Sequence, residues 1–124
     1  MNSKKRPSLT SNNKVIGITL GDPAGIGPEI VAKSLKQRSF SRVTFVIIGD
    51  DVLFKKYNIK EEKRRILINC RNFSQLHQIK KGVFKKNGAA ALSYLHKAVT
   101  LLRQKKNSYT CHRAYFFKSY VSII

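Results

Sequence analysis

The chain has 124 residues, which suits at most one small domain, and its formal net charge is +19. Apolar residues make up 42% of it, enough for a modest core, which excludes wholesale disorder. No apolar run approaches the roughly 18 residues of a membrane-spanning helix, and two cysteines are too few for a disulfide scaffold. We therefore expect a globular, cytoplasmic chain.

The positive charge is spread along the whole sequence. All six acidic residues lie between Asp22 and Glu62, and 14 lysines and arginines occur from Lys63 onward without a carboxylate. One interpretation is a small basic nucleic-acid-binding module, since aromatic residues interleave with bases at Phe84 and in 115–118. No nucleic-acid-binding motif accompanies the charge, so we favour a lysine-rich, solvated surface.

The first third of the chain predicts a strand, a loop and a helix. We expect residues 1–13, which are polar and basic, to form a disordered leader. The β-branched run at 15–20 predicts a buried strand, and the glycines and prolines of 21–28 predict a loop. A helix then fits 28–37, with a proline at its first position and an apolar stripe formed by Ile30, Val31, Ser34 and Leu35.

The same alternation continues to residue 104. Residues 43–48 form a second continuous apolar run, and Asp50 or Asp51 can cap a short helix through about Tyr57. A third strand is predicted at 65–69.

Irregular structure is expected at 70–87 and a long helix at 88–104. The apolar stripe of that helix consists of Ala91, Leu92, Leu95, Ala98, Val99 and Leu102. The order of strands and helices indicates an α/β layer fold with parallel strands.

The loop after the first strand is the segment that points most clearly to a function. A strand, a glycine-rich turn and a helix N-terminus together present backbone N–H groups and a positive dipole end to an anion. The glycine spacing matches neither the phosphate-binding loop of nucleoside triphosphatases nor the glycine motif of dinucleotide-binding folds. An anion site and a tight connection whose glycines only permit close packing therefore both remain open. The candidate residues are Gly21, Asp22, Pro23, Gly25, Gly27 and Glu29.

Residues 18–30 read ITLGDPAGIGPEI, which closely resembles the N-terminal signature of the 4-hydroxythreonine-4-phosphate dehydrogenase family. Residues 43–50 look like the second strand and turn of that family, and residues 87–99 resemble one of its helices. The resemblance covers residues 14–106.

This resemblance implies the N-terminal part of an isopropylmalate-dehydrogenase-like three-layer α/β fold, and an incomplete one. The family uses NAD or NADP to oxidise 4-phosphooxy-L-threonine, which then loses carbon dioxide to give 3-amino-2-oxopropyl phosphate, a step of pyridoxal 5′-phosphate biosynthesis. A divalent metal (zinc, magnesium or cobalt) held by histidines polarises the reacting oxygen atoms. The implied partners are a small phosphorylated substrate and a second copy of the chain, with no membrane.

The resemblance carries no catalytic or metal-binding residue onto this chain. The family's metal-binding histidines and phosphate-binding residues lie beyond the matched region, and His77 and His96 have no counterpart among them. Cys70 with Cys111 and His112 is a poor metal set, because adjacent residues seldom bind one ion together and no fourth ligand is evident. We therefore expect a chain truncated before the active site and inactive alone.

These expectations divide the chain into a leader (1–13), an α/β segment (14–106) and a tail (107–124). The tail is aromatic-rich and matches nothing expected of the family. A shift of reading frame near Lys106 would explain it, and a short protein with a novel tail is the alternative.

Overall fold

The computed structural model describes residues 14–37, 42–82, 84–104 and 121–123. Strands and helices alternate along them, which confirms the predicted α/β fold. The elements in chain order are β1 (Lys14–Thr19), α1 (Gly27–Gln37), β2 (Val43–Gly49), α2 (Asp51–Lys56), β3 (Arg65–Asn69), the short 3-10 helix η1 (Leu76–Gln78), α3 (Lys85–Gln104) and β4 (Val121–Ile123). The leader 1–13, the residues 105–120 and the last residue lie outside the described part, so the expected division of the chain stays a prediction.

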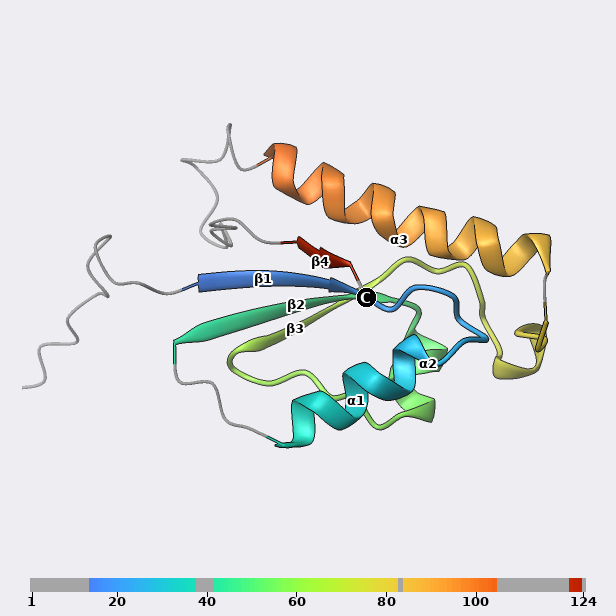
Figure 1. Cartoon of the computed structure of the whole chain (residues 1–124), viewed down its shortest axis with the longest axis horizontal. Coiled ribbons are helices and arrows are strands. Elements are labelled where there is room, and N and C mark those ends of the chain that lie inside the picture. The colour runs from blue at the N-terminus through green and yellow to red at the C-terminus, as the bar shows by residue number, and fades with distance from the viewer. Residues whose placement is uncertain (1–13, 38–41, 83, 105–120, 124) are drawn as a thin grey trace, which may run out of the picture.

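The strands form one parallel sheet in the order β3-β2-β1-β4. The chain moves outward from β1 through β2 to β3, and then returns to the other side of β1 with β4. Helices α1 and α2 lie on one face of the sheet and α3 lies on the other, so the molecule has three layers (Figure 1). The connection from β3 to β4 therefore passes over the opposite face from the earlier crossovers.

The core lies between the sheet and its helices. The position of β2 inside the sheet explains why its sequence is continuously apolar. Val46, Ile47 and Ile48 of β2 are each at most 1% exposed, because neighbouring strands and helices cover both of their faces. Leu20, directly after β1, is fully buried, and its N–H donates to the carbonyl of Ile48. The carboxyl ends of β1 and β2 are thus held together where the loops begin.

The first two strands and helices lie within one residue of their predicted bounds, and β3 matches its prediction. Helix α1 buries a slightly different face from the expected stripe: Val31, Ala32 and Leu35 are buried, whereas Ile30 is 38% exposed and Ser34 is exposed. The helix is therefore turned so that Ala32 packs against the core.

Helix α3 departs further from the prediction, in its start and in its buried face. It begins at Lys85, because the carbonyl of Phe84 accepts the N–H groups of Asn87 and Gly88. Two residues of the predicted stripe, Leu92 and Val99, are 57% and 39% exposed. The residues that α3 buries are Asn87, Ala90, Tyr94 and Ala98.

Strand β4 was not expected from the sequence. Gly17 of β1 pairs with Val121, and Thr19 pairs with Ile123, in parallel register. Three residues without flanking turn signals are too short a run to distinguish a strand from irregular chain.

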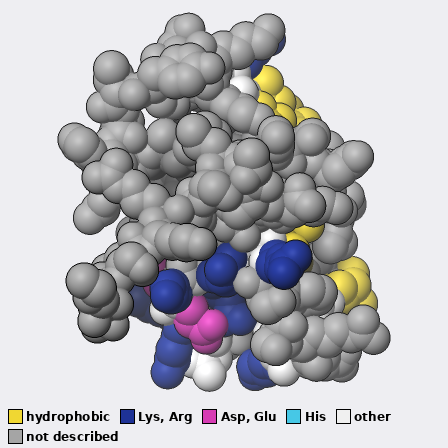
Figure 2. Space-filling view, turned by 90° about the vertical axis from the view of Figure 1, so that its left-hand side faces the viewer, with side chains coloured by type: hydrophobic (Ala, Val, Ile, Leu, Met, Phe, Trp, Pro, Cys, Tyr) yellow, Lys and Arg dark blue, Asp and Glu magenta, His cyan; other side chains and the backbone are white. Residues whose placement is uncertain are grey.

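Basic and acidic side chains lie side by side at one end of the described molecule (Figure 2). Figure 2 views the end of the molecule at which the strands begin, and its described lysines and arginines surround acidic side chains. Arg65, the first residue of β3, contacts Glu62 at 3.3 Å. Among the described helices, none is long and apolar enough to cross a membrane.

Candidate functional site

The glycine-rich loop occupies a special position in the sheet. It follows β1, and β1 lies between β2, reached by the first crossover, and β4, reached by the last. Open α/β sheets bind ligands outside the carboxyl ends of their strands, at the point where the strand order reverses. The loop from Gly21 to Glu29 begins at that point.

The structural interpretation of the glycines is supported at two positions. Gly21 has a φ of 70°, in the left-handed region that glycine adopts at little cost. A Cβ at Gly27 would lie 2.4 Å from the carbonyl oxygen of Leu20, so only glycine lets the first turn of α1 approach β1 this closely. These two glycines shape the connection whether or not it binds a ligand.

Asp22 also has a local structural role. Its side-chain oxygen Oδ1 accepts the N–H of Ala24 at 2.9 Å, and its carbonyl accepts the N–H of Gly25 at 2.9 Å. This is the alternative in which an aspartate bonds to neighbouring loop N–H groups. Asp22 therefore fixes the shape of the loop from within.

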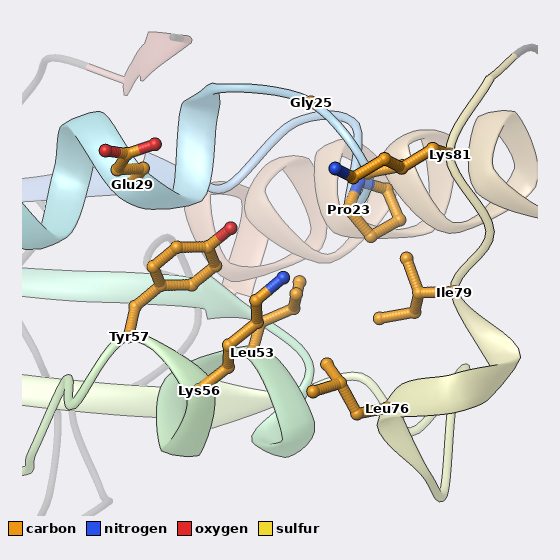
Figure 3. Close-up of a pocket in the computed structure, with 10 residues that line it drawn as sticks. Pro23, Gly25, Glu29, Leu53, Lys56, Tyr57, Leu76, Ile79 and Lys81 are labelled. Atoms are coloured by element: carbon orange, nitrogen blue, oxygen red, sulfur yellow. The ribbon is translucent and has the colours of Figure 1, made fainter.

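The remaining candidates, Pro23, Gly25 and Glu29, line a pocket of about 330 Å³. Its other walls come from α2 with the residue that follows it, and from η1 with the segment that follows it. Figure 3 shows the pocket, with Lys81 extending toward Pro23 and the hydroxyl of Tyr57 pointing toward the ribbon of α1. The other lining residues are Ala24, Leu53, Lys56, Tyr57, Leu76, Ile79 and Lys81.

The pocket carries two ammonium groups, from Lys56 and Lys81, and one carboxylate, from Glu29. Glu29 is engaged by Lys33 at 2.6 Å, and that hydrogen bond lowers the pKa of Glu29 below its ordinary value. The balance of charge favours an anionic ligand, and the apolar side chains of Leu53, Leu76 and Ile79 suit a neutral part of it. Sequence reasoning missed both lysines, because nothing distinguishes them from the chain's many other lysines before folding.

Directly below the loops lies a buried polar network that the sequence did not reveal. Asp50 occupies the residue before α2, as expected, but its side chain does not cap that helix. Instead it accepts hydrogen bonds from Asn72 and from the hydroxyl of Tyr94. Burial and the bond to Asp50 raise the pKa of Tyr94 above its ordinary value.

A second, open hollow of about 630 Å³ lies between the end of β3 and α3. Cys70, Ser93 and His96 line it, and burial raises the pKa of the Cys70 thiol. His77 lies apart from them in η1. No group of three histidines, cysteines or carboxylates that could hold a metal exists among the described residues, and Cys111 and His112 lie outside them.

Comparison with known proteins finds relatives that are named as dehydrogenases of 4-phosphate compounds. No family model matches the chain. The 4-hydroxythreonine-4-phosphate dehydrogenase of Aquifex aeolicus is 35% identical over an alignment that covers 70% of this chain and 31% of that protein. The D-threonate 4-phosphate dehydrogenase of Pectobacterium atrosepticum is 51% identical over 37 residues, which are 30% of this chain and 11% of that one.

The fold leads to the same group. The crystal structure of a 4-hydroxythreonine-4-phosphate dehydrogenase from Burkholderia phymatum superposes with a TM-score of 0.62 and 28% identity. The superposition covers 75% of this chain and 34% of that one. The chain thus spans about a third, or less, of the length of the proteins it matches.

Proposed function

We propose that this chain, which resembles the 4-hydroxythreonine-4-phosphate dehydrogenases in sequence and in fold, supplies the first strand–loop–helix unit of an NAD- or NADP-dependent dehydrogenase. The observation that supports this most is the place of the Gly21–Glu29 loop, at the carboxyl end of β1 where the strand order reverses. The reaction would oxidise 4-phosphooxy-L-threonine, with loss of carbon dioxide to 3-amino-2-oxopropyl phosphate, toward pyridoxal 5′-phosphate. When bound, the nicotinamide cofactor accepts a hydride from the secondary alcohol.

The role of this chain in that reaction is binding and orientation. The pocket lies beside the first turn of α1, whose positive dipole end favours an anion, and Lys56 and Lys81 add two positive charges there. A phosphate of the cofactor or of the substrate is the anion that suits them. Leu53 and Ile79 provide an apolar wall that excludes water around the bound group.

The family's divalent metal has no fitting set of ligands in the described residues. We therefore assign no catalytic residue and no metal-dependent step to them. Turnover in this proposal needs residues from the part of the relatives that this chain does not cover, and the chain alone is inactive. A second copy as partner and a cytoplasmic location are consistent with this role.

The substrate belongs to a narrow chemical class. The two groups of relatives are named for 4-hydroxythreonine 4-phosphate and for D-threonate 4-phosphate, both of which are 4-phosphate esters of four-carbon acids. We propose a substrate of that class, and both compounds belong in the assay. A basic nucleic-acid-binding module is not favoured, because the relatives are dehydrogenases.

The decisive experiment is a titration of the full chain with NAD, in which NMR monitors the amide resonances of Gly25 and Gly27. We expect both to shift, and Lys81→Gln to weaken binding several-fold. Lys85→Gln, at a lysine outside the pocket, is the matched control and should leave the affinity unchanged. Unmoved resonances at saturating NAD would refute a cofactor site at the loop.

A second measurement concerns turnover. With either 4-phosphate ester and NAD, the purified chain should form no NADH above the rate without protein. Measurable NADH formation would show that the chain contains a complete active site, against the proposal.

A further inference from the structure

A fully buried carboxylate lies directly after β2, at the carboxyl edge of the sheet. Asp50 is 0% exposed. The backbone N–H of Asn72 donates to its Oδ1 at 2.6 Å, and the side-chain amide of Asn72 and the hydroxyl of Tyr94 donate to its Oδ2. None of the ion pairs in the described residues includes Asp50, so hydrogen bonds are what compensate its burial.

These bonds connect three parts of the chain that are far apart in sequence. The carbonyl of Asp50 accepts the N–H groups of Leu53 and Phe54 and so begins α2. Asn72 belongs to the connection after β3, and Tyr94 is a fully buried residue in the middle of α3. Asp50 is therefore the residue at which α2, the 70–73 connection and α3 meet.

The 70–73 connection depends on such an anchor, because it turns sharply. Arg71 has a φ of 58°, in the left-handed region that side chains rarely adopt. The N–H of Cys70 donates to the carbonyl of Gly49 at 2.8 Å, and the amide of Asn72 also donates to Oγ of Ser93 at 2.8 Å. The turn is thus fixed to β2 on one side and to α3 on the other.

Both segments that leave this network build the pocket wall opposite the loop. Lys56 ends helix α2 and Tyr57 follows it directly, and the chain that continues from Asn72 carries Leu76, Ile79 and Lys81. We propose that Asp50 is a positioning residue that fixes this wall relative to Gly25, through its bonds to Asn72 and Tyr94. The inference rests on the proposed function for the identity of the ligand, but not for the geometry.

The test compares variants of the full chain, first without ligand and then with NAD. Asp50→Ala removes the acceptor of three hydrogen bonds, and it leaves the backbone N–H of Asn72 and the hydroxyl of Tyr94 without the partner that they have in the wild type. We expect the amide resonances of Lys56, Ile79 and Lys81 to move and the affinity for NAD to fall about tenfold or more. Asp50→Asn keeps an acceptor for the N–H of Asn72 and should restore most of both.

Leu35→Ala is the matched control, since it destabilises the core near the end of α1 that lies away from the pocket. It should lower the melting temperature without moving those resonances or the affinity. If Asp50→Ala does not fold, Tyr94→Phe, which removes one hydrogen bond, should give the same changes to a smaller extent.

Two outcomes separate the two proposals. If the wild type does not bind NAD but Asp50→Ala moves the three resonances, the ligand is wrong and the positioning role stands. If Asp50→Ala or Tyr94→Phe lowers the melting temperature while the resonances stay as in Leu35→Ala, Asp50 only stabilises the fold and the positioning role is refuted.

Discussion

Gly27 is the residue at which the loop's shape depends most on the absence of a side chain. An added Cβ would lie 2.4 Å from the carbonyl oxygen of Leu20. This oxygen belongs to the backbone, so it cannot rotate away as a flexible side chain can. We predict that Gly27→Ala lowers the free energy of unfolding by about 1–3 kcal/mol, as overpacking does. Chemical denaturation of the two proteins measures the difference.

Gly88 provides the control for that prediction. It lies inside α3, and an added Cβ there would meet nothing within 4 Å. Gly88→Ala should raise the free energy of unfolding by about 0.5–1 kcal/mol, because alanine loses less backbone entropy in a helix. Equal effects of the two substitutions would contradict the close approach at Gly27.

The raised pKa of Tyr94 should make the free energy of unfolding fall at alkaline pH. Its pKa is raised in the folded state by burial and by the bond to Asp50, whereas in the unfolded chain a tyrosine ionises near about 10. Unfolding at high pH therefore releases a proton, so this contribution to stability is present below that pH and is lost as the pH rises above it.

We predict that wild-type stability falls between about pH 9 and about pH 11 more steeply than that of Tyr94→Phe. Thermal unfolding at several pH values measures both slopes, and the variant itself controls for the lysines that lose charge over the same range. Parallel slopes would show that Tyr94 ionises as easily in the folded protein as in the unfolded chain.

The residues of the candidate site were only partly predictable. The loop was found because its glycines and prolines are adjacent in sequence, where their chemistry can be read directly. The bonds of Asp50 reach 22 residues along the chain to Asn72 and 44 to Tyr94, and no local pattern encodes such distances. An aspartate after a strand predicts a helix cap, and tertiary contacts redirected its side chain.

At the scale of elements, α3 is oriented by its polar residues as much as by its apolar ones. The predicted stripe included Leu92 and Val99, but Tyr94 lies at the centre of the buried face, where its hydroxyl reaches Asp50. The apolar residues of α3 extend around more than one side, so periodicity alone could not select the inward one. The early start of α3 was missed because Lys85 and Lys86 are unfavourable near a positive dipole end and give no N-terminal signal.

This orientation predicts opposite sensitivities along α3. Ala98 is fully buried, so Ala98→Leu should cost about 1–3 kcal/mol of stability through overpacking. Leu92→Lys, at an exposed position, should change the free energy of unfolding by less than about 0.5 kcal/mol. If denaturation shows that Leu92→Lys costs as much stability as Ala98→Leu, α3 packs on the face that the apolar stripe indicated.

The strands were predicted more closely than the helices. Continuous β-branched runs such as that of β2 are long enough to be unambiguous, and both faces of β2 are buried as such a run requires. Strand β4 has too few residues to give a pattern. Its place beside β1 depends on pairing with a strand about a hundred residues earlier, which no local pattern indicates.

At the scale of the whole molecule, the charge of +19 opposes folding by self-repulsion. The i,i+4 pairs Lys33–Glu29 and Lys55–Asp51 are exposed and contribute little to stability, so salt screens more repulsion than attraction. We predict that the melting temperature rises as sodium chloride increases from about 10 mM to about 0.15 M. Scanning calorimetry at constant pH measures it, and a falling melting temperature would mean that attractive pairs dominate.

The pairing of β4 with β1 can form only late during synthesis of the chain. Gly17 faces Val121 across the sheet, so one edge of β1 remains open until about a hundred further residues have been made. At about 5–20 residues per second, that interval lasts about 5–20 seconds. An open strand edge is a template for any other strand that meets it. The speed of the ribosome, and not only the final stability, therefore influences how much newly made chain escapes aggregation.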